Sequence, residues 1–385
     1  MTVPNVVTLG DLAPLPADLM ATIMGEKPVR GFDASHVAFI ERAIAGHDAV
    51  LKDKPDDLHA NYNKALLLLS IGRFEEGWPL FEWRLEVKDS IFKYDWFPIE
   101  RWDRGDITGK NVLVWLEQGI GDQVMAVSMI PQLAAKAKSV VLMADQRFGE
   151  IFARSFPNVE FYKTGCKVPA RLKAWDFDCQ LSVSDLGSMF RKSFAEFTTE
   201  PYLKADPVKM AALRRKYLGK SDGPLIGFSW MSANQNFGLQ KSIPPAYFLP
   251  LAKMPGATYV SLQYGDHDID KQAFRDLGAD FIDDKSIDPL LSLDDCAAQI
   301  AACDMVISVS NSTVHLAGAM GVPVHALVPL GHGRVWYWHT GMNPSPWYPS
   351  VQIHRCEKVD DWSYAINSAW QAAFKGMHNV RSRAA

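Results

Sequence analysis

The segment Cys303–Val324, with the sequence CDMVISVSNSTVHLAGAMGVPV, carries the strongest structural signal in the chain. Its pattern predicts a buried β-strand over Met305–Val309, a polar turn, and a helix with Asn311 or Ser312 at the N-cap. A helix that begins at the carboxyl end of a parallel strand offers backbone N–H groups and its positive dipole end to an anion. We therefore predict a phosphate-binding corner of an α/β protein, to which His315 adds a side-chain donor.

A second corner of the same kind lies far upstream. The apolar run Asn111–Leu116 predicts a strand, Glu117–Asp122 (EQGIGD) predicts a tight turn, and the apolar spacing from Gln123 onward predicts a helix. Two strand–turn–helix corners so far apart indicate two Rossmann-like domains that face each other across a cleft. The expected fold class is therefore α/β.

Length and composition limit the class of protein. The 385 residues suit two or three domains, and 48% hydrophobic with 22% charged residues is typical of a globular chain. A net charge of -4 lacks the basic field that binds nucleic acid or a membrane surface. The sequence shows no apolar run of membrane-spanning length, no secretory signal and only scattered cysteines. We therefore expect reduced thiols in a cytoplasmic protein.

Ahead of the first α/β corner the chain has a helical pattern. Residues 58–87 predict a helical hairpin, in which the spacing of Ala65, Leu69, Gly72 and Phe74 is that of a tetratricopeptide unit. A single unit cannot bury its own apolar face. We therefore expect the hairpin to dock on the domain that follows it.

Shifts in composition and periodicity divide the chain into successive segments. In order these are an N-terminal helical segment (1–57, with an amphipathic helix over Ala34–Leu51), the tetratricopeptide-like hairpin (58–106), an N-terminal Rossmann-like domain (107–205), a charged linker (206–223), a C-terminal Rossmann-like domain (224–355) and a C-terminal helix packing back across both domains (356–378). The strands expected in the two domains are Asn111–Leu116, Val140–Met143, Val159–Tyr162, Leu225–Trp230, Tyr259–Gln263, Asp280–Ile282, Met305–Val309 and Val324–Val328.

Several motifs, taken in order, resemble a known group of enzymes. They are EQGIGD (Glu117–Asp122), GFSW (Gly227–Trp230), KS (Lys241–Ser242), SLQ (Ser261–Gln263), NSTVHLAGA (Asn311–Ala319) and WYPS (Trp347–Ser350). Together they resemble the bacterial tetratricopeptide-linked glycosyltransferases of the GT-B fold, related to the heptosyltransferase (family 9) clan. One departure is that Ser310-Asn311-Ser312 stands where heptosyltransferases carry Asp and then Thr-Gly, so the heptose donor is not carried over.

The resemblance implies that the C-terminal domain holds a nucleotide-sugar and that the N-terminal domain presents the acceptor. It implies inverting transfer without a metal or other cofactor, the nucleotide-sugar being a substrate. The acceptor would be a hydroxyl on a protein, such as flagellin or another surface protein, or on a glycan. The donor-binding candidates lie at or after the carboxyl ends of strands in the second domain: Trp230, Lys241, Gln263, Ser310, Asn311, Ser312, Thr313 and His315.

Sugar transfer needs a group that holds the leaving phosphate and a base that takes the proton of the acceptor hydroxyl. By resemblance, Lys241 contacts the phosphate and Asp122 is the candidate general base, with Glu117 as its substitute. Two glycines of the same turn, Gly119 and Gly121, allow the backbone to approach the substrate closely.

Each of these assignments has a structural alternative. Asp122 is also what an ordinary helix start favours, because a carboxylate there interacts well with the helix dipole. Lys241 is also read as a solvated surface lysine, and His315 as a histidine buried against the sheet.

Two apparent metal motifs carry less weight. Asp266-His267-Asp268 resembles the Asp-x-Asp motif of other sugar transferases, but such a triplet arises readily in a polar loop. His325, His332 and His339 recur every seven residues, but the proline and glycines between them prevent one continuous helix. We therefore predict no metal site.

Two other classes of protein remain as alternatives. Gly119–Met125 is an incomplete dinucleotide-binding fingerprint, and Asp145 follows at the spacing of a ribose-binding acid, so a nicotinamide-dependent enzyme is the weaker alternative. The stronger one is a non-catalytic nucleotide-sugar-binding or adaptor protein that uses a degenerate GT-B fold.

Overall fold

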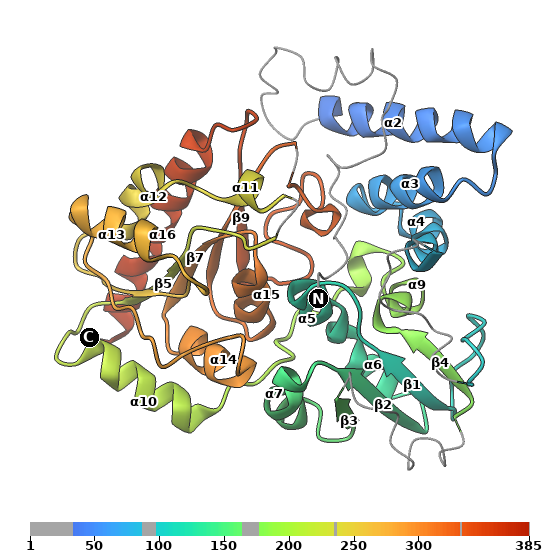
Figure 1. Cartoon of the computed structure of the whole chain (residues 1–385), viewed down its shortest axis with the longest axis horizontal. Helices are drawn as coiled ribbons and strands as arrows, with labels where there is room; N and C mark the ends of the chain where they lie inside the picture. The colour runs from blue at the N-terminus through green and yellow to red at the C-terminus, as the bar shows by residue number, and fades with distance from the viewer. Residues whose placement is uncertain (1–33, 87–97, 164–176, 235–236, 332, 385) are drawn as a thin grey trace.

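The computed structural model describes residues 34–86, 98–163, 177–234, 237–331 and 333–384. These residues form two α/β units, each built on a parallel sheet, with a group of helices beside them (Figure 1). The predicted α/β class with parallel sheets is therefore confirmed. The first 33 residues of the predicted N-terminal segment, and the whole of residues 87–97 within the predicted hairpin segment, lie outside the described residues.

The first sheet has the strand order β3-β2-β1-β4. Its strands are β1 (Asn111–Trp115), β2 (Ser139–Ala144), β3 (Glu160–Lys163) and β4 (Cys179–Ser182). Three of them lie where the sequence predicts strands, within one or two residues at each end. β4 was not predicted, although all four of its residues are buried beside β1.

The second sheet has the order β6-β5-β7-β8-β9. Its strands are β5 (Leu225–Ser229), β6 (Thr258–Ser261), β7 (Met305–Val309), β8 (Val324–Val328) and β9 (Val351–Arg355). Every residue of β5, β7 and β8 is buried, because helices cover both faces of a parallel sheet. The expected strand over Asp280–Ile282 is wrong: only Ile282 forms a bridge, to Val260.

Helices connect these strands and place their N-termini at the carboxyl edges of the sheets. In the first unit they are α5 (Ile120–Ala126), α6 (Ile130–Ala134), α7 (Gly149–Ser155) and α9 (Gly187–Phe190). In the second unit they are α11 (Gly238–Lys241), α12 (Pro245–Ala252), α13 (Asp268–Asp276), α14 (Leu293–Ala301), α15 (Ser312–Ala319) and α16 (Ser363–Ala384). Between the units lies α10 (Pro207–Leu218), where the sequence predicts the linker helix, and the Asp206 carboxylate caps it.

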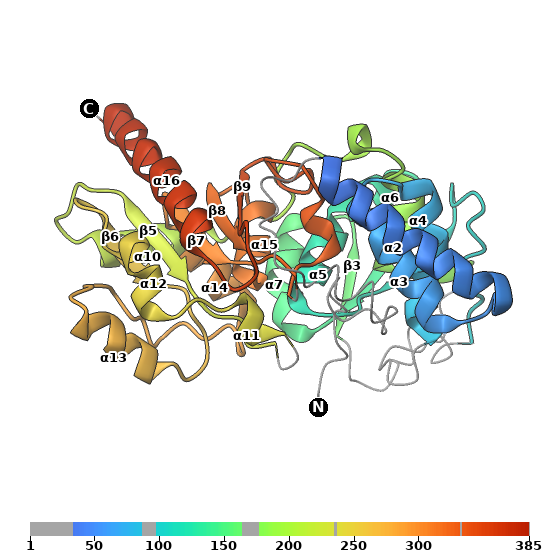
Figure 2. The same cartoon turned by 90° about the horizontal axis from the view of Figure 1, so that it is seen from above.

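The C-terminal helix does not cross both units as predicted. Its buried residues belong to one apolar cluster with the strands and helices of the second unit, and it packs mainly on α12, β8 and β9. Figure 2 shows α16 at the end of the molecule opposite to α2. The aromatic spacing of the helix identified an apolar face, but one sheet is enough to cover it.

The helices ahead of the first unit are α2 (Ala34–Asp53), α3 (Leu58–Ser70), α4 (Phe74–Phe81) and the short η1 (Glu82–Glu86). The helix expected over Ala34–Leu51 is present, and α3 and α4 form the expected hairpin around Gly72. The second helix is shorter than predicted, because η1 replaces its last part with 3-10 geometry.

The hairpin docks on both units rather than on the next one alone. On the first unit, the Trp78 indole lies flat on Gly187, where a Cβ would meet the ring at 2.5 Å. On the second unit, Trp78 meets Trp336 edge to face at 5.6 Å. His339 Nδ1 donates to the Leu69 carbonyl at 2.9 Å. The hairpin therefore bridges the two α/β units.

A buried ionic group fixes η1 to the first sheet. Arg84, whose side chain is only 4% exposed, donates to Glu117 after β1, through Nε at 2.7 Å, and to Asp185 after β4, through Nη2 at 2.8 Å. The third nitrogen, Nη1, donates to the Phe81 carbonyl at 2.8 Å. The guanidinium thus joins the hairpin to the carboxyl ends of two strands.

Replacing this arginine should cost much of the stability of the first unit. Arg84→Ala leaves two carboxylates without their cation in the interior, and we expect a loss of about 3–5 kcal/mol in the free energy of unfolding. Urea denaturation measures it. The control is Arg104→Ala, whose ion pair with Glu82 is about one-third exposed and should cost no more than ~1 kcal/mol. Equal losses in the two variants would contradict the assignment.

Candidate functional site

The two corners predicted from the sequence meet in the structure. The start of α5, after β1, packs against α15, after β7. Gly121 lies so close to the His315 ring that a Cβ in its place would meet Cδ2 at 2.7 Å. The absence of a side chain at Gly121 therefore allows the two units to touch here. The sequence predicts that this turn approaches the substrate closely, and in the structure its backbone at Gly121 approaches the other unit.

Asp122 lies in the first turn of α5 and is 7% exposed. Its carboxylate is turned toward the backbone of Gly119. Burial raises the pKa of Asp122 to about 7, against the opposing effect of the positive charge of Lys241. A carboxyl group with such a pKa exchanges its proton near neutral pH, as a general base requires.

Lys241 ends α11 in the second unit and is also buried. Its ammonium group lies over the Phe237 ring, 4.7 Å from the ring centroid. Its charge lowers the pKa of Asp122 and of His315, so it acts on groups from both units. Lys241 is therefore not the solvated surface lysine of the structural alternative, and its charge acts on Asp122 of the other unit.

His315 does not have the predicted role of an open phosphate donor. It is 1% exposed. Its Nδ1 is hydrogen-bonded to the Tyr348 hydroxyl at 2.8 Å, and its Nε2 to the Tyr337 hydroxyl at 3.3 Å. Burial, together with the charge of Lys241, lowers the pKa of His315 to about 3. The neutral ring is thus part of the contact between the units, although it lies beside the turn that carries Asp122.

One backbone N–H group at the start of α15 is already used by the N-cap residue, Asn311. The Asn311 side chain accepts from the Thr313 N–H at 3.0 Å. The Asn311 amide nitrogen donates to Ser229 Oγ at 2.7 Å and to the Met231 carbonyl at 2.9 Å. Asn311 therefore ties β7 to β5, and it leaves fewer N–H groups for an anion than the sequence predicts.

The two serines that flank Asn311 differ from it. Ser310 Oγ is enclosed and makes no hydrogen bond to any residue that the structure describes. Ser312 is partly exposed, and its hydroxyl bonds to that of Tyr264. Thr313 is buried. Of these three residues only Ser312 is partly exposed, so its hydroxyl is the group that this corner presents at its surface.

Two other predicted donor ligands have structural roles. Trp230 is fully buried, stacks on Phe228 and donates its indole N–H to Asp270 at 3.1 Å. Gln263 uses its side-chain oxygen to accept from Ser229 Oγ and from the backbone of Trp230 and Met231. Position at the end of a strand identified both residues, but their side chains support the loop after β5.

Glu117, the predicted substitute base, is also held in structural hydrogen bonds. It accepts from Arg84, and from the Ser182 hydroxyl, and lies inside the first unit. The roles of Arg84, and of Tyr337 and Tyr348 beside His315, were not predicted from the sequence. The WYPS motif contains Tyr348, which is the only sequence signal for any of these groups.

A narrow pocket lies beside Asp122. Its walls come from the hairpin (Trp78 and Phe81), from α5 and from the aromatic segment of the second unit (Trp336 and Trp347). It leaves about 10 Å³, room for about one water molecule.

The other signals in the sequence lead to no separate site. Asp145 pairs with Arg147 at 3.0 Å and caps a short helix, so its carboxylate already has structural partners. His325 and His339 lie in different surroundings, and His332 lies outside the described residues. The described part of the chain contains no cluster of three or more metal-binding side chains, and no described helix is both long and apolar enough to cross a membrane.

Comparison with known proteins finds one relative by sequence and a shared fold among solved structures. No family model matches the chain. The chain is 31% identical to Protein FlbA of Caulobacter vibrioides over 352 residues, an alignment that covers 86% of this chain and 58% of that protein. The chain thus spans little more than half the length of this relative, whose name states no activity.

One solved structure shows the same architecture. A family 9 glycosyl transferase from Veillonella parvula matches with a TM-score of 0.53 and 13% identity, over 72% of this chain and 99% of that one. ADP-heptose heptosyltransferase II of E. coli matches with a TM-score of 0.49 and 15% identity, over 71% and 99%. The likeness to the Veillonella protein shows that this chain has its two-unit α/β fold.

The close contact between Gly121 and His315 predicts that a larger residue at position 121 destabilises the protein. Gly121→Ala places a methyl group against the His315 ring, which is held by two tyrosines, and we expect a loss of about 1–3 kcal/mol in the free energy of unfolding. Urea denaturation measures the loss. Gly149→Ala, at the start of α7, meets only an ordinary contact at 3.4 Å and should change stability by less than ~0.5 kcal/mol. A neutral Gly121→Ala variant would contradict the close contact.

Proposed function

We propose that this protein is a glycosyltransferase that moves a sugar from a nucleotide-sugar to a hydroxyl of a protein or glycan, without a metal ion. The observation that carries the proposal is that Asp122 of the first unit and Lys241 of the second are both buried, with the charge of Lys241 acting on the Asp122 carboxyl. A buried carboxyl with a pKa near neutrality lies within reach of the charge of a buried lysine. The shared fold with a family 9 glycosyl transferase supports it.

In this proposal each group acts on a separate part of the reaction. The acceptor oxygen attacks the anomeric carbon of the sugar, and Asp122 takes the hydroxyl proton. The bond from that carbon to the phosphate oxygen breaks, and the nucleotide leaves with the electron pair on that oxygen. Lys241 and the hydroxyls of Ser310 and Ser312 stabilise its charge. Opening of the α5–α15 contact admits the substrates, and closure excludes water.

The role of Asp122 predicts the pH dependence of the reaction. Because burial raises the pKa of this carboxyl to about 7, its basic form is populated only above that pH, and kcat/KM should rise with pH through about 7. Asp122→Asn should lower kcat by about 10²–10⁴-fold and leave donor affinity unchanged. Asp276→Asn, on the exposed face of α13, is the matched control. Full turnover by Asp122→Asn would exclude it as the base.

The role of Lys241 predicts a loss of donor affinity. Lys241→Ala removes the charge that faces the leaving phosphate and should weaken nucleotide-sugar binding by at least about tenfold, or ~1.4 kcal/mol. Isothermal titration calorimetry measures it. Lys241→Arg should recover part of the affinity, and Lys220→Ala, at an exposed lysine of the linker that follows α10, should have no effect. Unchanged binding by Lys241→Ala would remove Lys241 from the donor site.

A non-catalytic nucleotide-sugar-binding or adaptor protein is the competing function. The observation that favours it is the start of α15, where Asn311 already uses the Thr313 N–H. A thermal-shift panel of UDP-, GDP-, ADP- and CMP-sugars identifies the nucleotide that binds, because a ligand stabilises the form to which it binds. Binding of that donor without transfer or hydrolysis would favour the adaptor and count against the enzyme.

A further inference from the structure

The Arg84 guanidinium contacts the wall of the narrow pocket beside Asp122. Phe81 is part of that wall and belongs to the hairpin. Arg84 Nη1 donates to the Phe81 carbonyl at 2.8 Å, and the guanidinium lies over the Phe81 ring, 4.5 Å from its centroid. A planar guanidinium binds its partners in fixed directions, so it holds both the backbone and the ring of this wall residue in place.

Two further parts of the wall are next in sequence to carboxylates that Arg84 binds. Gln118 lines the pocket and follows Glu117, which accepts from Arg84 Nε at 2.7 Å. Ser184 lines it and precedes Asp185, which accepts from Nη2 at 2.8 Å. These three charged side chains are at most 4% exposed, so water competes little for their hydrogen bonds. One guanidinium thus sets the spacing of three parts of the wall.

The turn EQGIGD passes this constraint on to the proposed base. Glu117 is its first residue and Asp122 its last. Gln118 has a φ of 65°, in the left-handed region that residues other than glycine rarely adopt, and its carbonyl accepts from the Gln123 side chain at 2.9 Å. The Asp122 carboxylate is turned toward the Gly119 backbone. Because the turn is held at both ends, a displacement of Glu117 also displaces Asp122.

Glu117 also acts on Asp122 through its charge. Burial raises the pKa of Asp122, the positive charge of Lys241 lowers it, and the negative charge of Glu117 raises it. Burial also shifts the pKa values of four further groups that interact with Asp122 or contact its turn, so that they are neutral near neutral pH: Tyr62, Tyr337, Tyr348 and His315. Removal of the Glu117 charge should therefore lower the pKa of Asp122.

We propose that Arg84 and Glu117 are positioning residues for the proposed base: Arg84 fixes the wall of the pocket, and Glu117 fixes the turn that carries Asp122. The proposal rests on the proposed glycosyl transfer and adds a residue of the hairpin to its machinery. A displacement of about 1 Å in a reacting group can cost about 10²-fold in rate. Loss of this positioning should therefore lower kcat and leave donor affinity unchanged.

The first test replaces the guanidinium and keeps its charge. Arg84→Lys leaves a cation between the two carboxylates but cannot reproduce the planar fork, and we expect kcat to fall at least about tenfold with the donor Kd unchanged. The donor is the UDP-, GDP-, ADP- or CMP-sugar selected by the thermal-shift panel, and release of its nucleotide, with water as the acceptor, measures kcat. The stoichiometry of donor binding in calorimetry counts the folded molecules, so unfolded protein does not affect the value.

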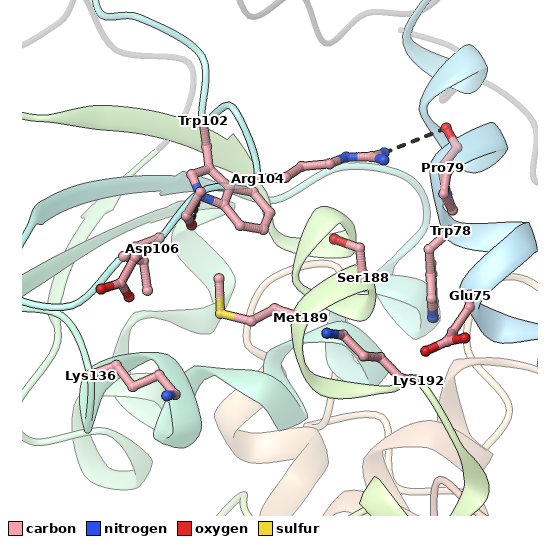
Figure 3. A pocket seen from close by; sticks show the side chains of 12 residues that line it. Glu75, Trp78, Pro79, Trp102, Arg104, Asp106, Lys136, Ser188, Met189 and Lys192 are labelled. Atoms are coloured by element: carbon pink, nitrogen blue, oxygen red, sulfur yellow. Dashed lines mark hydrogen bonds between the residues drawn. The ribbon is translucent and has the colours of Figure 1, made fainter.

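The matched control is Arg104→Lys, because Arg104 also joins the hairpin to the first unit. Figure 3 shows Arg104 reaching toward Pro79 of α4, and it pairs with Glu82 at 2.8 Å. It borders the larger cavity drawn there, of about 460 Å³, and not the pocket beside Asp122. The same substitution at this partly exposed pair should leave kcat unchanged. Equal losses of kcat in the two variants, or no loss in Arg84→Lys, would overturn the proposal.

The second test changes charge alone, and it decides the matter if Arg84→Lys does not fold. Glu117→Gln keeps an acceptor oxygen for Arg84 but removes the charge that raises the pKa of Asp122. The midpoint of the pH profile of kcat/KM should therefore move to lower pH, which a purely structural role of Glu117 would not cause. Glu150→Gln, at a carboxylate of α7 that is 70% exposed, is the control and should not move it.

NMR of the aspartate carboxyl carbons follows the same titration without substrate, and Asp122→Asn identifies the signal. An unmoved midpoint in Glu117→Gln, or equal shifts in this variant and the control, overturns the proposal. Abolished turnover in Glu117→Gln would make Glu117 itself the base and would overturn it as well. If the unmodified protein turns over no donor, the proposed function fails, and the carboxyl titration still tests the positioning pair separately.

Discussion

The buried guanidinium of Arg84 is the interaction on which the organisation of this molecule depends. It lies where the hairpin, the turn after β1 and the turn after β4 come together, and it satisfies a carboxylate from each turn. Charges taken out of water are stable only with such complete pairing. The same turn after β1 continues into α5 and Asp122, so the geometry of the proposed base is coupled to the docking of the hairpin.

The hairpin makes more contacts than its sequence pattern predicts. A single tetratricopeptide-like unit is expected to dock on the domain that follows it, but here the apolar face of α4 is covered by both α/β units. It forms part of the wall of the pocket beside Asp122. The helices thus contribute to the proposed site directly.

The sequence predicted the fold more closely than the site, for a physical reason. Continuous apolar runs such as Met305–Val309 are long enough to identify buried strands, and strand ends locate the corners. Which way a side chain points depends on partners distant in sequence. Glu117 pairs with a residue 33 positions away, and His315 bonds to Tyr348, also 33 positions away. The side chains of Trp230 and Gln263 are likewise engaged by partners distant in sequence, whereas the charge of Lys241 acts on Asp122 across the two units.

The contact between Trp78 and Trp336 also affects the order in which the chain folds during synthesis. The two rings are far apart in sequence, and a ribosome that adds about 5–20 residues per second needs on the order of 10–50 s to make the intervening chain. Throughout that interval one aromatic side of α4 has no permanent cover. Nascent chains of this protein are therefore candidates for chaperone assistance until the last third of the polypeptide emerges.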